Sequence, residues 1–210
     1  HPIREFCARR GASLYRDFEA RADYDRETIE LLKPHAPDLL VLDGYVYLVT
    51  RPLLAAYRAR LINLHFSDLT LRWPDGRPRF PGLRSVGDAL AAGQPATRAT
   101  MHLVNEEPDG GAPIVLSWPF SVSPLVRDAC VWNAIDMLKA YAFSHQQWMM
   151  RAGSGPVLSI ALGLVAGGEV DLDALAAADP ATVSPWVVDE GGRVTAPRVR
   201  GAAFAALRRA

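Results

Sequence analysis

The chain has 210 residues, of which 50% are hydrophobic, and its 23 Lys and Arg balance its 23 Asp and Glu. This length and apolar content suit one sizeable core, and the zero net charge argues against nucleic acid or an anionic membrane as partner. Two cysteines exclude a disulfide framework and a cysteine-rich metal site, so we expect a reducing cytoplasm and a small-molecule ligand, with the oligomeric state left open.

Membrane insertion and export are not expected either. No uninterrupted apolar run reaches the roughly 18 residues that span a bilayer. The start of the chain also lacks the basic region and apolar core that mark a signal peptide. We therefore expect a soluble chain.

The chain opens with helical sequence. Pro2 to Arg10 is predicted to form a helix that Gly11 ends, and a short strand over residues 12–15 should follow. Asp23 is predicted to cap a second helix that continues to about His35.

The next segments alternate strands and helices. Residues 38–42 have the unbroken apolar character of a buried parallel strand. Thr50 and Pro52 mark a helix start, and this helix leads into a strand over residues 61–65. Residues 66–81 then form a long connection, either an exposed excursion or a lid over a substrate.

The second half continues this pattern. A short helix is predicted over residues 85–92, and a strand over 97–104 pairs antiparallel with one over 114–122. Residues 127–151 form the longest predicted helix, which should cover the sheet. The apolar run 155–161 is interpreted as an additional strand.

Beyond residue 171 the sequence is rich in Ala and in turn residues. A short helix, a hairpin around residues 189–192 and a basic helix from Arg198 are predicted. We expect one α/β domain over residues 1–170 and a C-terminal extension over 171–210.

Three polar residues could surround one reacting carbonyl. In the strand 61–65, Asn63 and His65 are two residues apart and share a face. Asp109 lies in a Pro-Asp-Gly-Gly turn. An amide can donate to an oxyanion, and a carboxylate can orient an imidazole and favour its charged form. Alone, each motif is more often a packed histidine or an ordinary turn.

The order and spacing of several segments resemble the folate-dependent formyltransferase family, and within it the members that act on glycinamide ribonucleotide. The resemblance covers about residues 1–150. The segments that carry it are residues 37–45, 61–65, 81–83, 88–93, 100–104 and 109–115.

The resemblance implies a fold, a reaction and a site. The fold is Rossmann-like, with a mainly parallel sheet and an antiparallel edge. The reaction is direct transfer of a formyl group from 10-formyltetrahydrofolate, a co-substrate, to a small-molecule amine, without a metal. The implied catalytic residues are Asn63, His65 and Asp109; the implied folate-binding residues are Asp43, Gly44, Tyr45, Val46, Tyr47, Asn105, Gly110 and Gly111; those on the substrate side are Phe66, Ser67, Pro81 and Gly82.

The sequence departs from the family pattern in two places. The family has Pro after the catalytic His, where this chain has Phe66, and residues 73–79 are an insertion, so the acceptor is left open. Family members also begin with a strand, a glycine-rich phosphate loop, a helix and a second strand, for which nothing precedes His1. Either the natural protein is longer, which we favour, or phosphate binding is lost.

Two alternative functions stay open. Water could replace the amine, which would give a 10-formyltetrahydrofolate hydrolase, or the chain could be a non-catalytic ligand-binding descendant of the family. His102 matches a histidine position in the family, but its place in an alternating strand favours a structural role. His35 and His145 are assigned no role.

Overall fold

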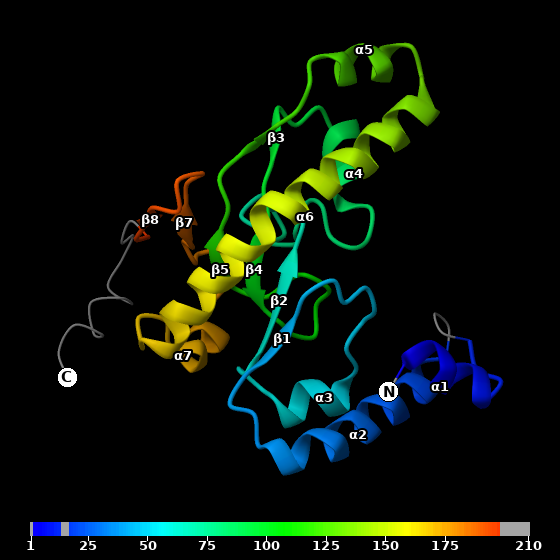
Figure 1. Ribbon diagram of the computed structural model, residues 1–210, viewed down its shortest axis with the longest axis vertical. Coiled ribbons are helices and arrows are strands. Elements are labelled where there is room, and N and C mark those ends of the chain that lie inside the picture. The colour runs from blue at the N-terminus through cyan, green and yellow to red at the C-terminus, as the bar shows by residue number, and fades with distance from the viewer. Residues whose placement is uncertain (1, 14–16, 198–210) are drawn as a thin grey trace.

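A six-stranded mixed sheet lies at the centre of the molecule (Figure 1). The structure is a computed structural model, and it describes residues 2–13 and 17–197. The strands follow in the order β1 (Leu40–Leu42), β2 (Leu61–His65), β4 (Thr100–Leu103), β5 (Pro113–Leu116), β7 (Trp186–Val188) and β8 (Val194–Thr195).

The sheet combines two parallel pairings with three antiparallel ones. β1 pairs with β2 and β5 with β7 in parallel, whereas β2–β4, β4–β5 and β7–β8 are antiparallel. The α/β class is confirmed. The hairpin predicted around residues 189–192 is confirmed as β7 and β8, which extend the sheet beyond β5.

Four short elements group beside β1 (Figure 1): α1 (Ile3–Arg9), α2 (Phe18–Leu32), a 3-10 helix η1 (Lys33–His35) and α3 (Arg51–Ala56). α1 ends before Gly11, whose φ of 63° favours glycine. Thr50 is the N-cap of α3, as predicted.

The predicted cap of α2 was wrong. Asp17 begins the helix, because its carboxylate accepts the backbone N–H of Ala20 at 2.9 Å, and Asp23 lies inside the first turns. Asp23 instead pairs with Arg10 and Arg26 on the helix surface. Of the strand predicted over 12–15, residues 12 and 13 are not in a strand, and the rest lies outside the described residues.

β1 and its neighbours also differ from the predictions. All three residues of β1 are half-buried, because β2 is its only pairing partner in the described part of the sheet. The expected strands 97–104 and 114–122 are each divided, and β3 (Ala96–Thr97) pairs with β6 (Phe120–Ser121) in a separate ribbon. At the break, the Ser117 hydroxyl accepts the N–H of Ala99, so a side chain interrupts the regular pairing.

The remaining helices are α4 (Ser85–Ala91), α5 (Leu125–Val131), α6 (Ile135–Ala166) and α7 (Leu172–Ala177). The helix predicted over 127–151 is broken at residues 132–134, where Asn133 has a φ of 53°. The strand predicted over 155–161 was wrong, because α6 continues through it with Pro156 inside the helix. A seven-residue apolar run does not by itself distinguish a strand from a helix.

α6 crosses the sheet and supplies much of its cover (Figure 1). Its buried residues recur every four positions at His145, Met149, Gly153, Val157 and Ala161, and so form one face. That face packs in the main core together with residues of β2, β4 and β5. The core therefore fixes the strands from which the polar site extends.

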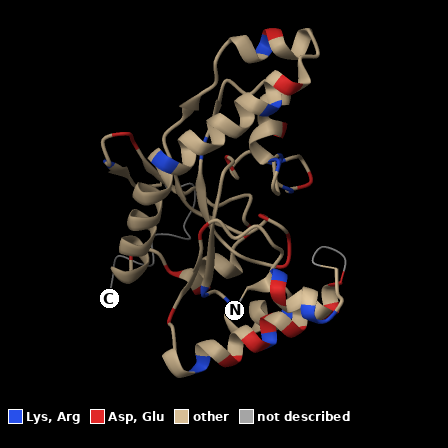
Figure 2. Cartoon of the chain, turned by 45° about the vertical axis from the view of Figure 1, so that its right-hand side comes forward, with Lys and Arg blue, Asp and Glu red and all other residues tan. Residues whose placement is uncertain are grey.

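By length and composition alone, α6 is also long and apolar enough to cross a membrane. Its 32 residues include an 18-residue window with a mean hydropathy of 1.4, of which 22% is buried. A helix in the core of a soluble protein passes the same test. Figure 2 shows the contrast with α1 and α2, where Lys and Arg alternate with Asp and Glu.

Candidate active site

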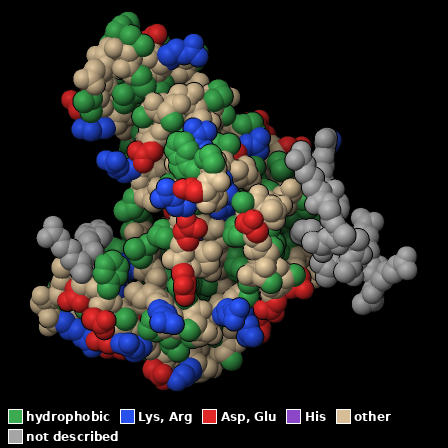
Figure 3. Space-filling view, turned by 180° about the vertical axis from the view of Figure 1, so that it is seen from behind, with side chains coloured by type: hydrophobic (Ala, Val, Ile, Leu, Met, Phe, Trp, Pro, Cys, Tyr) green, Lys and Arg blue, Asp and Glu red, His purple; other side chains and the backbone are tan. Residues whose placement is uncertain are grey.

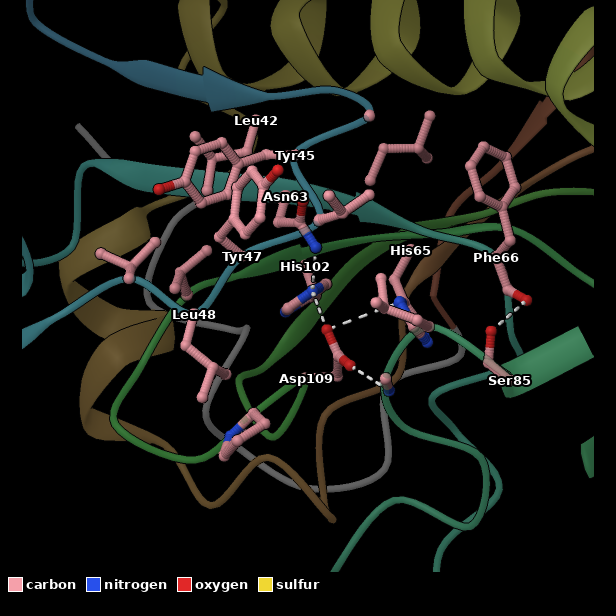
Figure 4. Close-up of a pocket in the computed structure, with 18 of the residues that line it drawn as sticks. Leu42, Tyr45, Tyr47, Leu48, Asn63, His65, Phe66, Ser85, His102 and Asp109 are labelled. Carbon is pink, nitrogen blue, oxygen red and sulfur yellow. Dashed lines mark hydrogen bonds and ion pairs between the residues drawn. The ribbon is translucent and has the colours of Figure 1, made fainter. Parts of the chain in front are cut away.

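Two adjacent strands and one loop bring four polar side chains together at the end of the sheet (Figure 4). β2 carries Asn63 and His65, and β4 carries His102 directly opposite Asn63 in the antiparallel register. Asp109 reaches them from the loop between β4 and β5. The three residues predicted to be catalytic, Asn63, His65 and Asp109, therefore lie together.

The Asp109 carboxylate lies between two imidazoles. Its Oδ1 atom is 3.5 Å from Nδ1 of His65 and 3.6 Å from Nε2 of His102. Its Oδ2 atom accepts the backbone N–H of Gly82 at 2.7 Å. Nε2 of His65 is 3.2 Å from the carbonyl oxygen of Phe80, so both ring nitrogens of His65 face oxygen acceptors. A doubly protonated His65 satisfies both acceptors.

The hydrogen bonds of His102 fix its tautomer. Nδ1 is 2.8 Å from the carbonyl oxygen of Leu103, which can only accept, so Nδ1 carries the hydrogen. Burial lowers the pKa of His102 to about 4, with Asp109 opposing and His65 reinforcing that shift. At neutral pH, Nε2 is therefore an acceptor for the Asn63 amide N–H, 3.2 Å away.

This contact orients the Asn63 amide. One N–H is directed at His102, and the other is left for a ligand. The amide oxygen is buried and has no hydrogen-bond partner among the described residues. The sequence favoured a structural role for His102, and the structure places this residue in the site, where it orients the amide of Asn63.

The backbone of the Asp109 loop is tightly constrained. Asp109 has a φ of 53°, a left-handed conformation that non-glycine residues seldom adopt. A Cβ atom on Gly111 would lie 1.7 Å from the carbonyl oxygen of Leu103, so only glycine allows this close approach. Gly111 thus serves the geometry of the loop.

A cavity of about 460 Å³ opens beside these residues. Of the site residues predicted from the sequence, the three catalytic candidates line this cavity. So do seven of the predicted binding residues: Gly44, Tyr45, Val46, Tyr47, Asn105, Phe66 and Gly82. The candidates that do not line it are Asp43, Gly110, Gly111, Ser67 and Pro81. Ser67 is buried behind the wall, where its hydroxyl donates to the Phe80 carbonyl.

One wall of the cavity is apolar and aromatic. Tyr45 and Tyr47 meet edge to face with their ring centroids 5.8 Å apart, and Leu42 and Leu48 lie beside them (Figure 4). Burial raises the pKa of Tyr45, which keeps its phenol neutral. This wall suits a flat, weakly polar ring system.

Sequence reasoning missed Arg21, a cavity-lining residue on α2. Its side chain is buried at 3% exposure, and its Nε and Nη2 atoms have no hydrogen-bond partner in the part of the chain that the structure describes. One turn further on, buried Asp25 accepts both the N–H and the hydroxyl of Thr50. Burial raises the pKa of Asp25. The i, i+4 spacing of Arg21 and Asp25 was the available signal.

Within residues 2–13 and 17–197, no group of three or more His, Cys, Asp or Glu residues is arranged to hold a metal ion. Both cysteines are free thiols.

Comparison with known proteins shows the family to which the chain belongs. The formyl transferase family profile matches residues 2–125, which is more than half of the chain. The chain belongs to the formyl transferase family. The resemblance found in the sequence is thereby confirmed, and the matched range ends after the Asp109 loop and β5.

Individual relatives of this formyl transferase family member support the family assignment. Phosphoribosylglycinamide formyltransferase of Escherichia coli (strain K12) is 34% identical over 99 residues, which are 47% of this chain and 42% of that protein. The enzyme of the same name from Bacillus subtilis (strain 168) is 36% identical over 100 residues, 48% of this chain and 47% of its own length. The chain thus spans less than half the length of these two relatives.

The fold is shared with a solved member of the family. The crystal structure of phosphoribosylglycinamide formyltransferase from Anaplasma phagocytophilum superposes with a TM-score of 0.52 at 20% identity. The match covers 70% of this chain and 60% of that one. This likeness supports the α/β architecture.

Proposed function

We propose that the chain transfers the formyl group of 10-formyltetrahydrofolate to the nitrogen of a small-molecule amine, with glycinamide ribonucleotide as the first acceptor to test. The observation that carries this proposal is the position of the Asp109 carboxylate, within 3.6 Å of both His65 and His102 and beside the amide of Asn63. Family membership supplies the reaction class.

The cavity has features that fit the donor. The wall of Tyr45, Tyr47 and Leu48 suits the pteridine ring of the donor. At the same cavity, two buried guanidinium nitrogens of Arg21 have no hydrogen-bond partner among the described residues. The guanidinium lies over the Tyr47 ring, 5.6 Å from its centroid, with Asp25 one turn away on the same helix, so we assign it to the wall that holds the pteridine ring.

The chemical step uses the polar end of the cavity. The lone pair of a neutral amine attacks the formyl carbon, a C–N bond forms, and the carbonyl electrons move to oxygen. The free N–H of Asn63 donates to this oxyanion, and the positive charge of His65 stabilises it.

Asp109 then completes the transfer. Its carboxylate, 3.5 Å from Nδ1 of His65, orients that imidazole and accepts the proton that leaves the attacking nitrogen, directly or through a water. When the C=O bond forms again, the bond to N10 of the folate breaks and N10 takes up a proton. Beside Asn63, His102 is a second candidate base, but its Nε2 already accepts the hydrogen bond from the Asn63 amide.

The experiment follows the fate of a donor labelled in its formyl carbon. We expect the label to move to the amine nitrogen when glycinamide ribonucleotide is added. The Asn63→Ala variant should keep its circular-dichroism spectrum and transfer about 10²–10³ times more slowly, as when one oxyanion donor is removed.

Three other results would count against transfer to this amine. Labelled formate released without acceptor would favour the hydrolase. Donor binding without turnover would favour the ligand-binding alternative, and the absence of donor binding would overturn the proposal. A cytoplasmic location is part of the proposal and rests on the two free cysteines.

A further inference from the structure

Residues 71–79, next to the active site, form a small hairpin that the proposed chemistry does not explain. Arg72 and Pro78 form an isolated antiparallel bridge, and Trp73 donates its N–H to the Arg77 carbonyl at 2.9 Å. The turn closes where the N–H of Gly76 donates to the Trp73 carbonyl. The hairpin thus presents its first arm to the loop that carries Asp109.

Arg72 joins this hairpin to the Asp109 loop. Its Nη2 atom is 3.2 Å from the carbonyl oxygen of Gly110 and 3.3 Å from that of Gly111, and Nη1 donates to the Gly76 carbonyl at 2.8 Å. One planar guanidinium therefore spans both chain segments, which the point charge of a lysine could not do in the same way.

A second contact reaches the carboxylate from the same segment. The N–H of Gly82, just beyond the hairpin, donates to Oδ2 of Asp109 at 2.7 Å, and the Phe80 carbonyl faces Nε2 of His65. The segment 66–82 therefore holds His65, the Asp109 carboxylate and the Asp109 loop backbone together. Among these contacts, Arg72 makes the only side-chain hydrogen bonds to Gly110 and Gly111 within the described residues.

We propose that Arg72 is a positioning residue, which locks the Asp109 loop so that the carboxylate stays aligned between His65 and the Gly82 N–H. The inference rests on the proposed formyl transfer and extends it to a residue outside the cavity. Burial lowers the pKa of Arg72, opposed by the carboxylates of Glu107 and Asp179, and the guanidinium remains a cation. Its charge is thus retained for the two carbonyl dipoles.

The test compares Arg72→Met and Arg72→Lys with Arg77→Met. Arg77 lies on the same hairpin, is exposed and forms an ion pair with Asp75 of that hairpin, so its loss controls for disturbance of the hairpin itself. We expect Arg72→Met to lower kcat about ten- to a hundredfold, as misplaced catalytic groups do, with donor affinity changed less than threefold. Arg72→Lys should recover part of the rate, and Arg77→Met should match the wild type.

A readout that needs no turnover is hydrogen exchange at the Gly82 N–H. Without Arg72 the carboxylate moves, so this amide should exchange at least tenfold faster, whereas the Val104 N–H, bonded to the Leu61 carbonyl, should keep its wild-type rate. Unchanged exchange and kcat in Arg72→Met would overturn the inference, as would an equal effect in Arg77→Met.

The two proposals fail in different ways. If the wild type transfers no formyl group, the proposed function falls, and faster exchange at Gly82 in Arg72→Met alone would still support the positioning role. If transfer occurs but Arg72→Met loses rate only in proportion to the fraction unfolded, with Gly82 and Val104 affected alike, Arg72 is merely structural and the inference fails.

Discussion

At the scale of single residues, the tautomer of His102 determines which way the Asn63 amide points. A protonated His102 would present an N–H to that amide in place of a lone pair, and the hydrogen bond from Asn63 Nδ2 would be lost. Burial of His102 at 2% exposure prevents this at neutral pH. A hydrophobic environment around one imidazole thus keeps the neighbouring amide ready to donate.

The depressed pKa of His102 predicts a pH dependence of stability. The folded chain binds this proton near pH 4 and the unfolded chain near pH 6.5, so between these values the unfolded state binds more protons. The free energy of unfolding should therefore fall as the pH is lowered from 6.5 towards 4. Urea unfolding at several pH values measures this.

Two histidine variants separate His102 from the other histidines. His102→Gln should flatten the slope, although part of it should persist because burial also lowers the pKa of His145. His35→Gln, at an exposed position, should leave the slope unchanged. An unaltered slope in His102→Gln would show that this imidazole does not titrate as the structure requires.

The sequence predicted the main residues of the site because their pattern is local. Asn63 and His65 share a face of one strand, and the Pro-Asp-Gly-Gly turn is recognisable on its own. The partnership of His102 with Asn63 could not be predicted, since it depends on the register between β2 and β4. Arg21 was equally hidden, because its burial depends on how α2 packs.

At the scale of elements, the connection between β4 and β5 depends on a glycine with no space for a side chain. Gly111→Ala would press a Cβ against the Leu103 carbonyl, and should destabilise the chain by about 1–3 kcal/mol or more. Gly163 in α6 is a matched control with nothing within 4 Å of its Cβ position. There, alanine should stabilise by about 0.5–1 kcal/mol.

Thermal unfolding measures both changes. With about 2–4 °C per kcal/mol for a chain of this size, Gly111→Ala should lower Tm and Gly163→Ala should raise it slightly. A Gly111→Ala variant as stable as the wild type would mean that the loop beside Asp109 is not held against β4 as described.

The sequence predicted helices and strands correctly where local signals determine their ends. The strand β2 and the helices α3 and α4 have clear start and stop residues, and they lie where predicted. The errors come from tertiary context. α6 continues through Pro156 because its apolar face packs on the sheet, and the β3–β4 break depends on the Ser117 side chain from another strand.

At the scale of the whole molecule, the sheet serves as a frame that brings distant segments to one end. β2 and β4 are neighbours in space although their first residues, Leu61 and Thr100, are 39 positions apart, and the insertion hairpin closes on the loop beyond β4. The face in Figure 3 has acidic and basic side chains interspersed, in line with the zero net charge. Recognition therefore depends on the cavity more than on a long-range field.

The central claim is that His65 and Asp109 act as one unit in formyl transfer. The most direct measurement is a double-mutant cycle on the single-turnover rate, with His65→Gln, Asp109→Asn and the double variant. Because each residue works through the other, the double variant should be about as slow as the slower single variant. If the two losses multiply instead, the two side chains act independently and the account is contradicted.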